Sequence, residues 1–118
     1  MDENKTNYKW HLPNKDILDA MYQNKDRIGG FASYCYWSSS EDSSITAWEQ
    51  DFYYYYSYQH NCTKDYRNRV RPVRALQTGH KETERIFTFG NQVYQVYPND
   101  FNDLIDWKTA MEECEKLN

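Results

Sequence analysis

Tyr36-Trp37-Ser38-Ser39-Ser40-Glu41 (residues 36–41), followed by Ala47-Trp48-Glu49-Gln50-Asp51-Phe52 (residues 47–52), is the part of the sequence that decides the fold. Tyr36 and Trp37 are the last two residues of an aromatic run, residues 33–37, which predicts a β-strand. The serine-rich residues 38–44 predict a loop. The second part alternates in polarity and predicts another strand. One face of that strand would carry Trp48, Gln50 and Phe52.

More strands are predicted on the C-terminal side. Residues 70–76 have strand composition, and Pro72 places them at a sheet edge or a bulge because proline cannot donate a ladder hydrogen bond. The polar residues 77–85 predict a linker. Two β-prone runs flank Gly90-Asn91 within residues 86–97, which predicts a β-hairpin.

Two helices are predicted, one before and one after these strands. Asn14 can cap the first, which ends at Gly29-Gly30, and Asp106 can cap the second. The apolar stripe of the second helix consists of Trp107, Ala110, Met111, Cys114 and Leu117. Two helices packed on short, mostly antiparallel strands give an α+β fold and a single domain over residues 1–118. The expected large core residues are Trp10, Trp37, Trp48, Phe52 and Trp107.

Composition argues against several classes of protein. The chain has 118 residues, a net charge of -4 and a pI near 5.3, which argues against a general nucleic-acid binder. No apolar run approaches the ~20 residues of a transmembrane helix, and no signal-peptide pattern opens the chain.

Cys35, Cys62 and Cys114 fit neither a zinc pattern nor a disulfide framework. We expect three unpaired thiols, with one disulfide and one free thiol as the alternative. The histidines lack ligand spacing, so no metal or other cofactor is expected.

Tyrosine is the most unusual component, with 12 copies in a chain that is 18% aromatic. It is densest at residues 53–58. Alternate side chains of a strand face opposite sides, so at least two of these tyrosines should be exposed. Exposed Tyr beside Ser, Asn and His is the composition of antibody-like binding loops. An aromatic core strand and an aggregation-prone segment are the alternative interpretations.

A basic run follows the tyrosines, opposed only by Asp65. It consists of Lys64, Arg67, Arg69, Arg71 and Arg74. One interpretation is a site for polyanions. The favoured interpretation is that these side chains pair with acids elsewhere or stack on aromatic rings.

Five motifs, taken in order, carry a family resemblance. They are Trp10-His11-Leu12-Pro13, Gly29-Gly30-Phe31, Tyr36 to Glu41, Ala47-Trp48 with Phe52, and Arg69-Val70-Arg71-Pro72-Val73-Arg74. They resemble the C-type-lectin-like domains of bacterial surface and phage proteins, the group that includes the Legionella collagen-like protein C-terminal domain and the Fibrobacter paralogous domain. The resemblance covers residues 10–76 and implies a C-type-lectin-like fold. Ile17 departs from the family pattern, which usually has Glu there.

A closer resemblance is to the variable proteins of diversity-generating retroelements. It implies a variable stretch over about residues 42–68, a place on a bacterial cell surface or phage particle, and non-enzymatic recognition of a protein or cell-surface ligand. Aromatic density and this variable stretch together select the expected ligand-binding residues. They are Ile45, Thr46, Glu49, Asp51, Tyr53, Tyr54, Tyr55, Tyr56, Tyr58, His60, Asp65 and Tyr66.

Two other functions stay open from the residues. Formylglycine-generating enzymes share this broad fold and use paired cysteines, a role that Cys35 and Cys62 could take only through their geometry. A structural surface module would bury its tyrosines. The Glu-Pro-Asn, Gln-Pro-Asp and Trp-Asn-Asp motifs of calcium-dependent sugar-binding lectins do not occur in the sequence. Tyr97-Pro98-Asn99-Asp100 predicts a turn.

The order of the segments differs from that of the resembled family. There, a hairpin and a helix like those of residues 86–118 come before the Trp-x-Leu-Pro motif, whereas here they follow the Arg-Val-Arg-Pro-Val-Arg strand. Joining Asn118 to Asp2 would restore the family order, so we expect a circular permutant with residues 77–85 as the new connector. The alternative is an excised boundary between tandem copies. A monomer or a domain-swapped dimer is expected.

Overall fold

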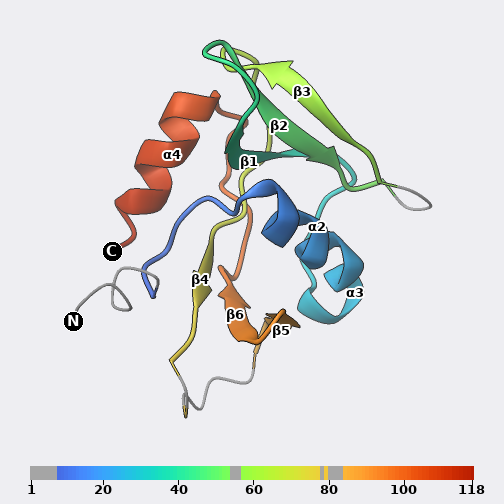
Figure 1. Ribbon diagram of the computed structural model, residues 1–118, viewed down its shortest axis with the longest axis vertical. Helices are drawn as coiled ribbons and strands as arrows, with labels where there is room; N and C mark the ends of the chain where they lie inside the picture. Colours follow the sequence, from blue (N-terminus) through green and yellow to red (C-terminus); the bar gives the residue numbers. More distant parts are fainter. Residues whose placement is uncertain (1–7, 54–56, 78, 80–83) are drawn as a thin grey trace.

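The computed structural model describes residues 8–53, 57–77, 79 and 84–118. These residues form three helices and two three-stranded antiparallel sheets, as Figure 1 shows. The predicted α+β class, with helices packed on short antiparallel strands, is therefore confirmed. No helix among the described residues is long and apolar enough to cross a bilayer.

The first sheet has the order β1-β2-β3, with β1 at Cys35–Glu41, β2 at Thr46–Asp51 and β3 at Gln59–Thr63. The predicted loop at residues 38–44 is wrong in its first half, because β1 continues to Glu41. The hydroxyl of Ser38 donates to the carbonyl of Trp48 at 2.7 Å, and the pairing register shifts between Trp37 and Glu41. The serine hydroxyl is thus satisfied inside the sheet, through an irregularity that composition did not indicate.

The second sheet has the order β4-β6-β5, with β4 at Val73–Ala75, β5 at Ile86–Phe89 and β6 at Gln92–Val96. The predicted hairpin is confirmed: Phe89 pairs with Gln92 across Gly90-Asn91. Gly90 has a φ of 63°, a conformation that glycine adopts without strain. β4 is an edge strand, which agrees with the position expected from Pro72.

Side-chain caps begin the two longer helices. α2 runs from Lys15 to Gln23, and the Asn14 side chain accepts a 2.8 Å hydrogen bond from the Ile17 amide. The predicted single helix ends at Gln23, and a one-turn helix, α3 (Lys25–Ile28), follows. α4 runs from Trp107 to Glu115, capped as predicted by Asp106, which accepts from the Thr109 amide at 2.9 Å.

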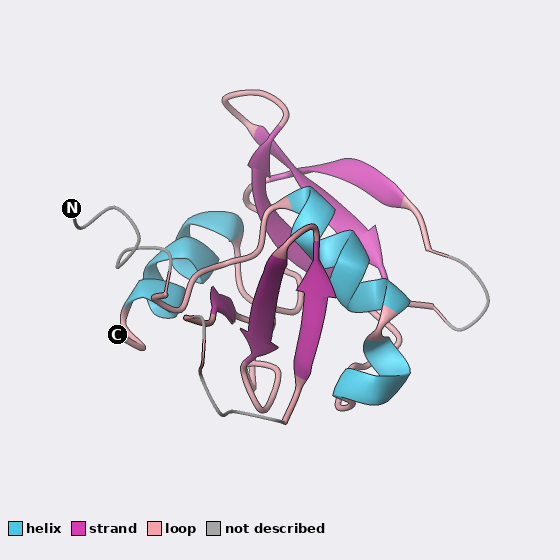
Figure 2. Cartoon of the chain, turned by 60° about the horizontal axis from the view of Figure 1, so that its bottom comes forward, coloured by secondary structure: helices cyan, strands magenta, loops and turns pink. Residues whose placement is uncertain are grey.

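Two apolar cores lie on opposite faces of β1, because the neighbours Tyr36 and Trp37 point in opposite directions. The first core joins Tyr36 to Phe52, α2 and the second sheet. The second joins Trp37 to Ala47, Val70 and α4. Figure 2 shows the result, with α2 and the C-terminal helix separated by strands. α2 and α4 therefore belong to different cores.

Of the five expected core aromatics, Trp37 and Phe52 are fully buried, and the other three tryptophans are only partly buried. A cation covers each partly buried ring. Lys15 lies over Trp48, Arg74 over Trp10 and Lys64 over Trp107, with charge-to-centroid distances of 4.6, 4.5 and 4.5 Å. The charged ends of these lysine and arginine side chains stay near water. The three tryptophan rings that they cover therefore lie at the rim of a core and not inside it.

The two ends of the described chain meet. The Trp10 amide donates to the Asn118 side chain at 2.7 Å, and that side chain donates back to the Trp10 carbonyl at 3.0 Å. β4 and β5 flank β6, so the strands on either side of the expected connector are about 10 Å apart. Nine connector residues can span up to about 30 Å. The distance between β4 and β5 is one that the predicted connector can span. Met1, which the permutation requires to lie near Asn118, is outside the described residues, so the permutation stays a prediction.

Candidate binding surface

The register of the first sheet places three of the expected binding residues together. Glu49 lies opposite His60, and Asp51 follows on the same face of β2. The Glu49 carboxylate lies 3.5 Å from His60 Nδ1, and the Asp51 carboxylate lies 3.9 Å from His60 Nε2. One half-exposed imidazole therefore stands between two largely covered carboxylates.

Neutral donors also hold both carboxylates, each through the oxygen that does not face His60. The Asn68 amide donates to Glu49 Oε1 at 2.9 Å, and the Cys35 thiol donates to Asp51 Oδ1 at 2.7 Å. Asn68 is itself buried, at 3% exposure. Sequence reasoning missed Asn68 and gave Cys35 no such role, because neither residue stands in a motif that indicates a carboxylate contact.

The cysteines are three unpaired thiols, as predicted. Burial, together with the hydrogen bond to Asp51, raises the pKa of Cys35 well above that of an ordinary thiol. Burial and the charge of Glu49 raise the pKa of Cys62 to about 11. Both thiols therefore stay protonated near neutral pH, where Cys35 acts as a hydrogen-bond donor and neither is a good nucleophile.

Tyrosines account for four of the eight large apolar side chains that are exposed among the described residues. They are Tyr34, Tyr53, Tyr58 and Tyr66, with exposures of 53%, 47%, 57% and 59%. The ring of Tyr58 lies 6.3 Å from that of His60, and Arg69 covers Tyr34 at 4.9 Å. The large amphipathic ring of Tyr58 thus lies next to the Glu49–Asp51–His60 group.

A buried amide network fixes the ends of the tyrosine-rich segment. Gln50, at 1% exposure, donates to Asp19 on α2 at 2.9 Å and to Ser57 at 2.7 Å. Gln59 donates to the side chain of Gln50 at 2.9 Å and to the Lys15 carbonyl at 2.7 Å. Both strands that enter and leave the segment are thereby tied to α2 by side chains outside the segment.

The structure separates some of the other expected binding residues from this group. Ile45 lies in the turn between β1 and β2, and Thr46, the first residue of β2, points to the face opposite Glu49. The Thr46 hydroxyl is used locally, donating to Asp42 at 3.3 Å. Asp65 and Tyr66 are exposed in the turn after β3, where the Tyr66 amide donates to the Thr63 carbonyl. Tyr54, Tyr55 and Tyr56 lie outside the described residues.

Most of the basic run is structural, as the favoured interpretation expected. Arg71, at 1% exposure, donates to the carbonyls of Tyr97, Gly29 and Pro98 and lies 3.7 Å from Asp100. Burial lowers the pKa of Arg71 and raises that of Asp100. Lys64 bonds to Glu41, and the arginines at 69 and 74 stack on aromatic rings.

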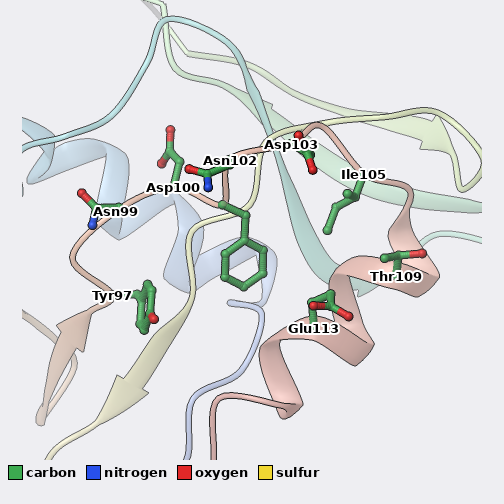
Figure 3. A pocket seen from close by; sticks show the side chains of 9 residues that line it. Tyr97, Asn99, Asp100, Asn102, Asp103, Ile105, Thr109 and Glu113 are labelled. Carbon is green, nitrogen blue, oxygen red and sulfur yellow. The ribbon is translucent and has the colours of Figure 1, made fainter.

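A separate groove of about 590 Å³ lies between residues 97–105 and α4 (Figure 3). Thr109 and Glu113 project into it from the helix, and Asn102, Asp103 and Ile105 come from the loop. Its Asp100 accepts a 2.6 Å hydrogen bond from Tyr36 and faces Arg71, so that carboxylate serves the core. The sequence predicted only a turn at residues 97–100.

The described residues contain no group of three or more His, Cys, Asp or Glu side chains arranged to hold a metal ion. Comparison with family models, curated proteins and solved structures found no match for this chain. The chemistry of the surface must therefore be judged from its own residues.

Proposed function

We propose that this chain is a non-enzymatic ligand-binding domain that displays a variable, tyrosine-rich surface on a C-type-lectin-like scaffold. The observation that carries the proposal is the exposed ring of Tyr58 beside Glu49, Asp51 and His60, on strands anchored by buried residues, in a chain whose exposed large side chains include three more tyrosines among the described residues. Tyr gives a large contact area at low entropic cost, which is why binding loops use it. The resemblance to variable proteins of diversity-generating retroelements supports a location on a bacterial cell surface or phage particle.

The residues that hold the fold differ from those at the surface, which supports the proposal. Trp37, Phe52 and Gln50 are at most 2% exposed and hold the sheet, whereas Tyr58 and His60 lie outside both cores. Surface side chains can therefore change without opening a cavity, which is the condition for varying a binding site on a fixed backbone.

The geometry of the cysteines favours binding over the enzymatic alternative. Cys35 pairs with Asp51, and Cys62 pairs with Ala47, four residues earlier on the strand between them. By ladder spacing, the Cα atoms of the two cysteines are roughly 16 Å apart, and neither thiol forms a disulfide. A formylglycine-generating site needs its cysteines together. The structural-module alternative needs buried tyrosines, and Tyr58 and Tyr66 are more than half exposed.

The proposal is tested by randomising the surface and measuring both folding and binding. One displayed library varies the exposed residues Tyr53, Tyr58, His60, Asp65 and Tyr66, and a matched library varies five buried positions. We expect most members of the first library to fold and some to bind a chosen immobilised protein, and most of the second to unfold. A surface library that unfolds as often as the buried one would refute the proposal.

The natural sequence is tested with labelled protein and a panel of bacterial cells. We expect cell binding that is lost when Tyr34, Tyr53, Tyr58 and Tyr66 are replaced by serine, with the melting temperature retained. A near-identical copy of the codons for about residues 42–68, beside a reverse transcriptase gene, is expected in the genome. Cell binding that persists in the serine variant would place the binding surface elsewhere.

A further inference from the structure

The two carboxylates of the candidate surface each leave one oxygen directed at the same exposed group. Asn68 and Cys35 occupy Glu49 Oε1 and Asp51 Oδ1, whereas Glu49 Oε2 and Asp51 Oδ2 face the two ring nitrogens of His60. The distances of 3.5 and 3.9 Å to His60 are longer than an ordinary N–H···O hydrogen bond. The imidazole therefore fills the space between the carboxylates without bonding closely to either one.

The local charge balance favours a cation at this position. Glu49 and Asp51 are 13% and 14% exposed, and charges removed from water attract an opposite charge more strongly. The neighbouring basic side chains are engaged elsewhere. Lys64 bonds to Glu41, and Arg69 lies over Tyr34. Among the ion pairs of the described residues, His60 is the partner recorded for both carboxylates.

We propose that the surface recognises a protein ligand through an arginine side chain, whose guanidinium displaces the His60 ring and bridges Glu49 and Asp51. Two guanidinium nitrogens have nearly the spacing of the two imidazole nitrogens that now face these carboxylates, and a guanidinium donates in a planar fork. The exposed ring of Tyr58, next to His60, provides an aromatic surface for the same cation. Lysine offers a single compact charge and bridges the pair less well. This inference rests on the proposed function, since it names the chemistry of the ligand at that surface.

The test is an NMR titration of the whole chain with N-acetyl-arginine methylamide, using the neutral isostere N-acetyl-citrulline methylamide as the control probe. We expect saturable shifts confined to Glu49, Asp51, Tyr58 and His60, at probe concentrations up to about 10 mM. The citrulline compound should cause no comparable shifts. The lysine analogue should bind more weakly than the arginine compound.

Matched variants locate the site. Asp51→Asn and Glu49→Gln should each weaken arginine binding about tenfold or more, because each removes a charge-assisted hydrogen bond. Glu113→Gln, in the groove beside α4, removes the same charge elsewhere and should leave the affinity unchanged. The His60 ring resonances of the natural chain report displacement directly, so a variant that failed to fold would not remove the test.

Three outcomes would overturn the inference. They are the absence of saturable shifts, equal shifts with arginine and citrulline, and shifts centred on residues 97–105. A failed arginine titration combined with loss of cell binding in the tyrosine-to-serine variant would reject the arginine ligand and retain the proposed binding surface. Full cell binding by that variant would reject the surface itself.

Discussion

Arg71→Met tests how the structure satisfies a buried charge. The guanidinium donates to three backbone carbonyls at 2.6, 3.0 and 3.1 Å and faces Asp100 at 3.7 Å. Methionine retains much of the apolar stem and removes every donor. Removing one partner of a buried ion pair costs about 3–5 kcal/mol, and a domain of this kind is stable by about 5–15 kcal/mol in total. We therefore expect the variant to lose a large fraction of its free energy of unfolding.

Urea unfolding of four proteins separates the ion pair from simple packing. They are the natural chain, Arg71→Met, Asp100→Asn and the double variant. The double variant should lose less than the sum of the two single losses, because Arg71→Met alone leaves the carboxylate of Asp100 buried without its cation. A loss below about 1 kcal/mol for Arg71→Met, or strict additivity, would refute this account of the Arg71–Asp100 pair.

The same pair predicts a pH dependence with a definite sign. Burial raises the pKa of Asp100 even beside Arg71, and removing the cation in Arg71→Met should raise it further. A carboxyl group whose pKa is higher in the folded state binds more protons when folded. Stability therefore falls as pH rises from about 3.9, the ordinary aspartate value, through the raised value. The deficit of Arg71→Met should be smaller in acid than at neutral pH, and an equal deficit would contradict this.

Three further predictions concern the anchor, the thiols and the segment order. Gln50→Leu should lower the free energy of unfolding by about 1–3 kcal/mol and speed hydrogen exchange around Ser57, because it leaves Asp19 and Ser57 without their hydrogen-bond donor. Unchanged exchange around Ser57 would show that Gln50 does not anchor the segment. Burial raises the pKa of Cys62 to about 11 and that of Cys114 to about 12, so alkylation near pH 8 should be slow for both in the folded chain, and faster for Cys62 at higher pH. A chain joined from Asn118 to Asp2 and opened within residues 77–85 should melt within about 5 °C of the natural chain, since Trp10 and Asn118 already meet; failure to fold would reject that joining.

Local signals in the sequence were sufficient for much of the fold. Caps at Asn14 and Asp106 and a two-residue turn at Gly90-Asn91 are short-range features, and each lies where its chemistry predicts. β3 was not predicted, because residues 59–63 have no alternation of polarity. The burial pattern of β3 explains this: as an edge strand, it leaves residues such as His60 and Asn61 exposed on both faces.

The site was harder to predict because it depends on register. Glu49, Asp51 and His60 were expected at the surface, and the pairing of β2 with β3 is what places them together. Asn68 and Cys35 could not be assigned to the carboxylates before the pairing was known, since they come from two other segments. Thr46 belongs to the variable stretch that the resemblance implies, but strand alternation directs it to the other face of β2.

The opposite orientations of Tyr36 and Trp37 explain how a small chain can hold a polar, aromatic surface in place. Each residue belongs to a separate core, so β1 is fixed from both faces. β2 is fixed by its pairing with β1 and by Gln50, whose amide reaches α2. Glu49 and Asp51 belong to neither apolar core, so the backbone of β2 does not depend on them for apolar packing. A sheet built in this way can change its exposed residues at little cost in folding, which is the property that a variable binding surface requires.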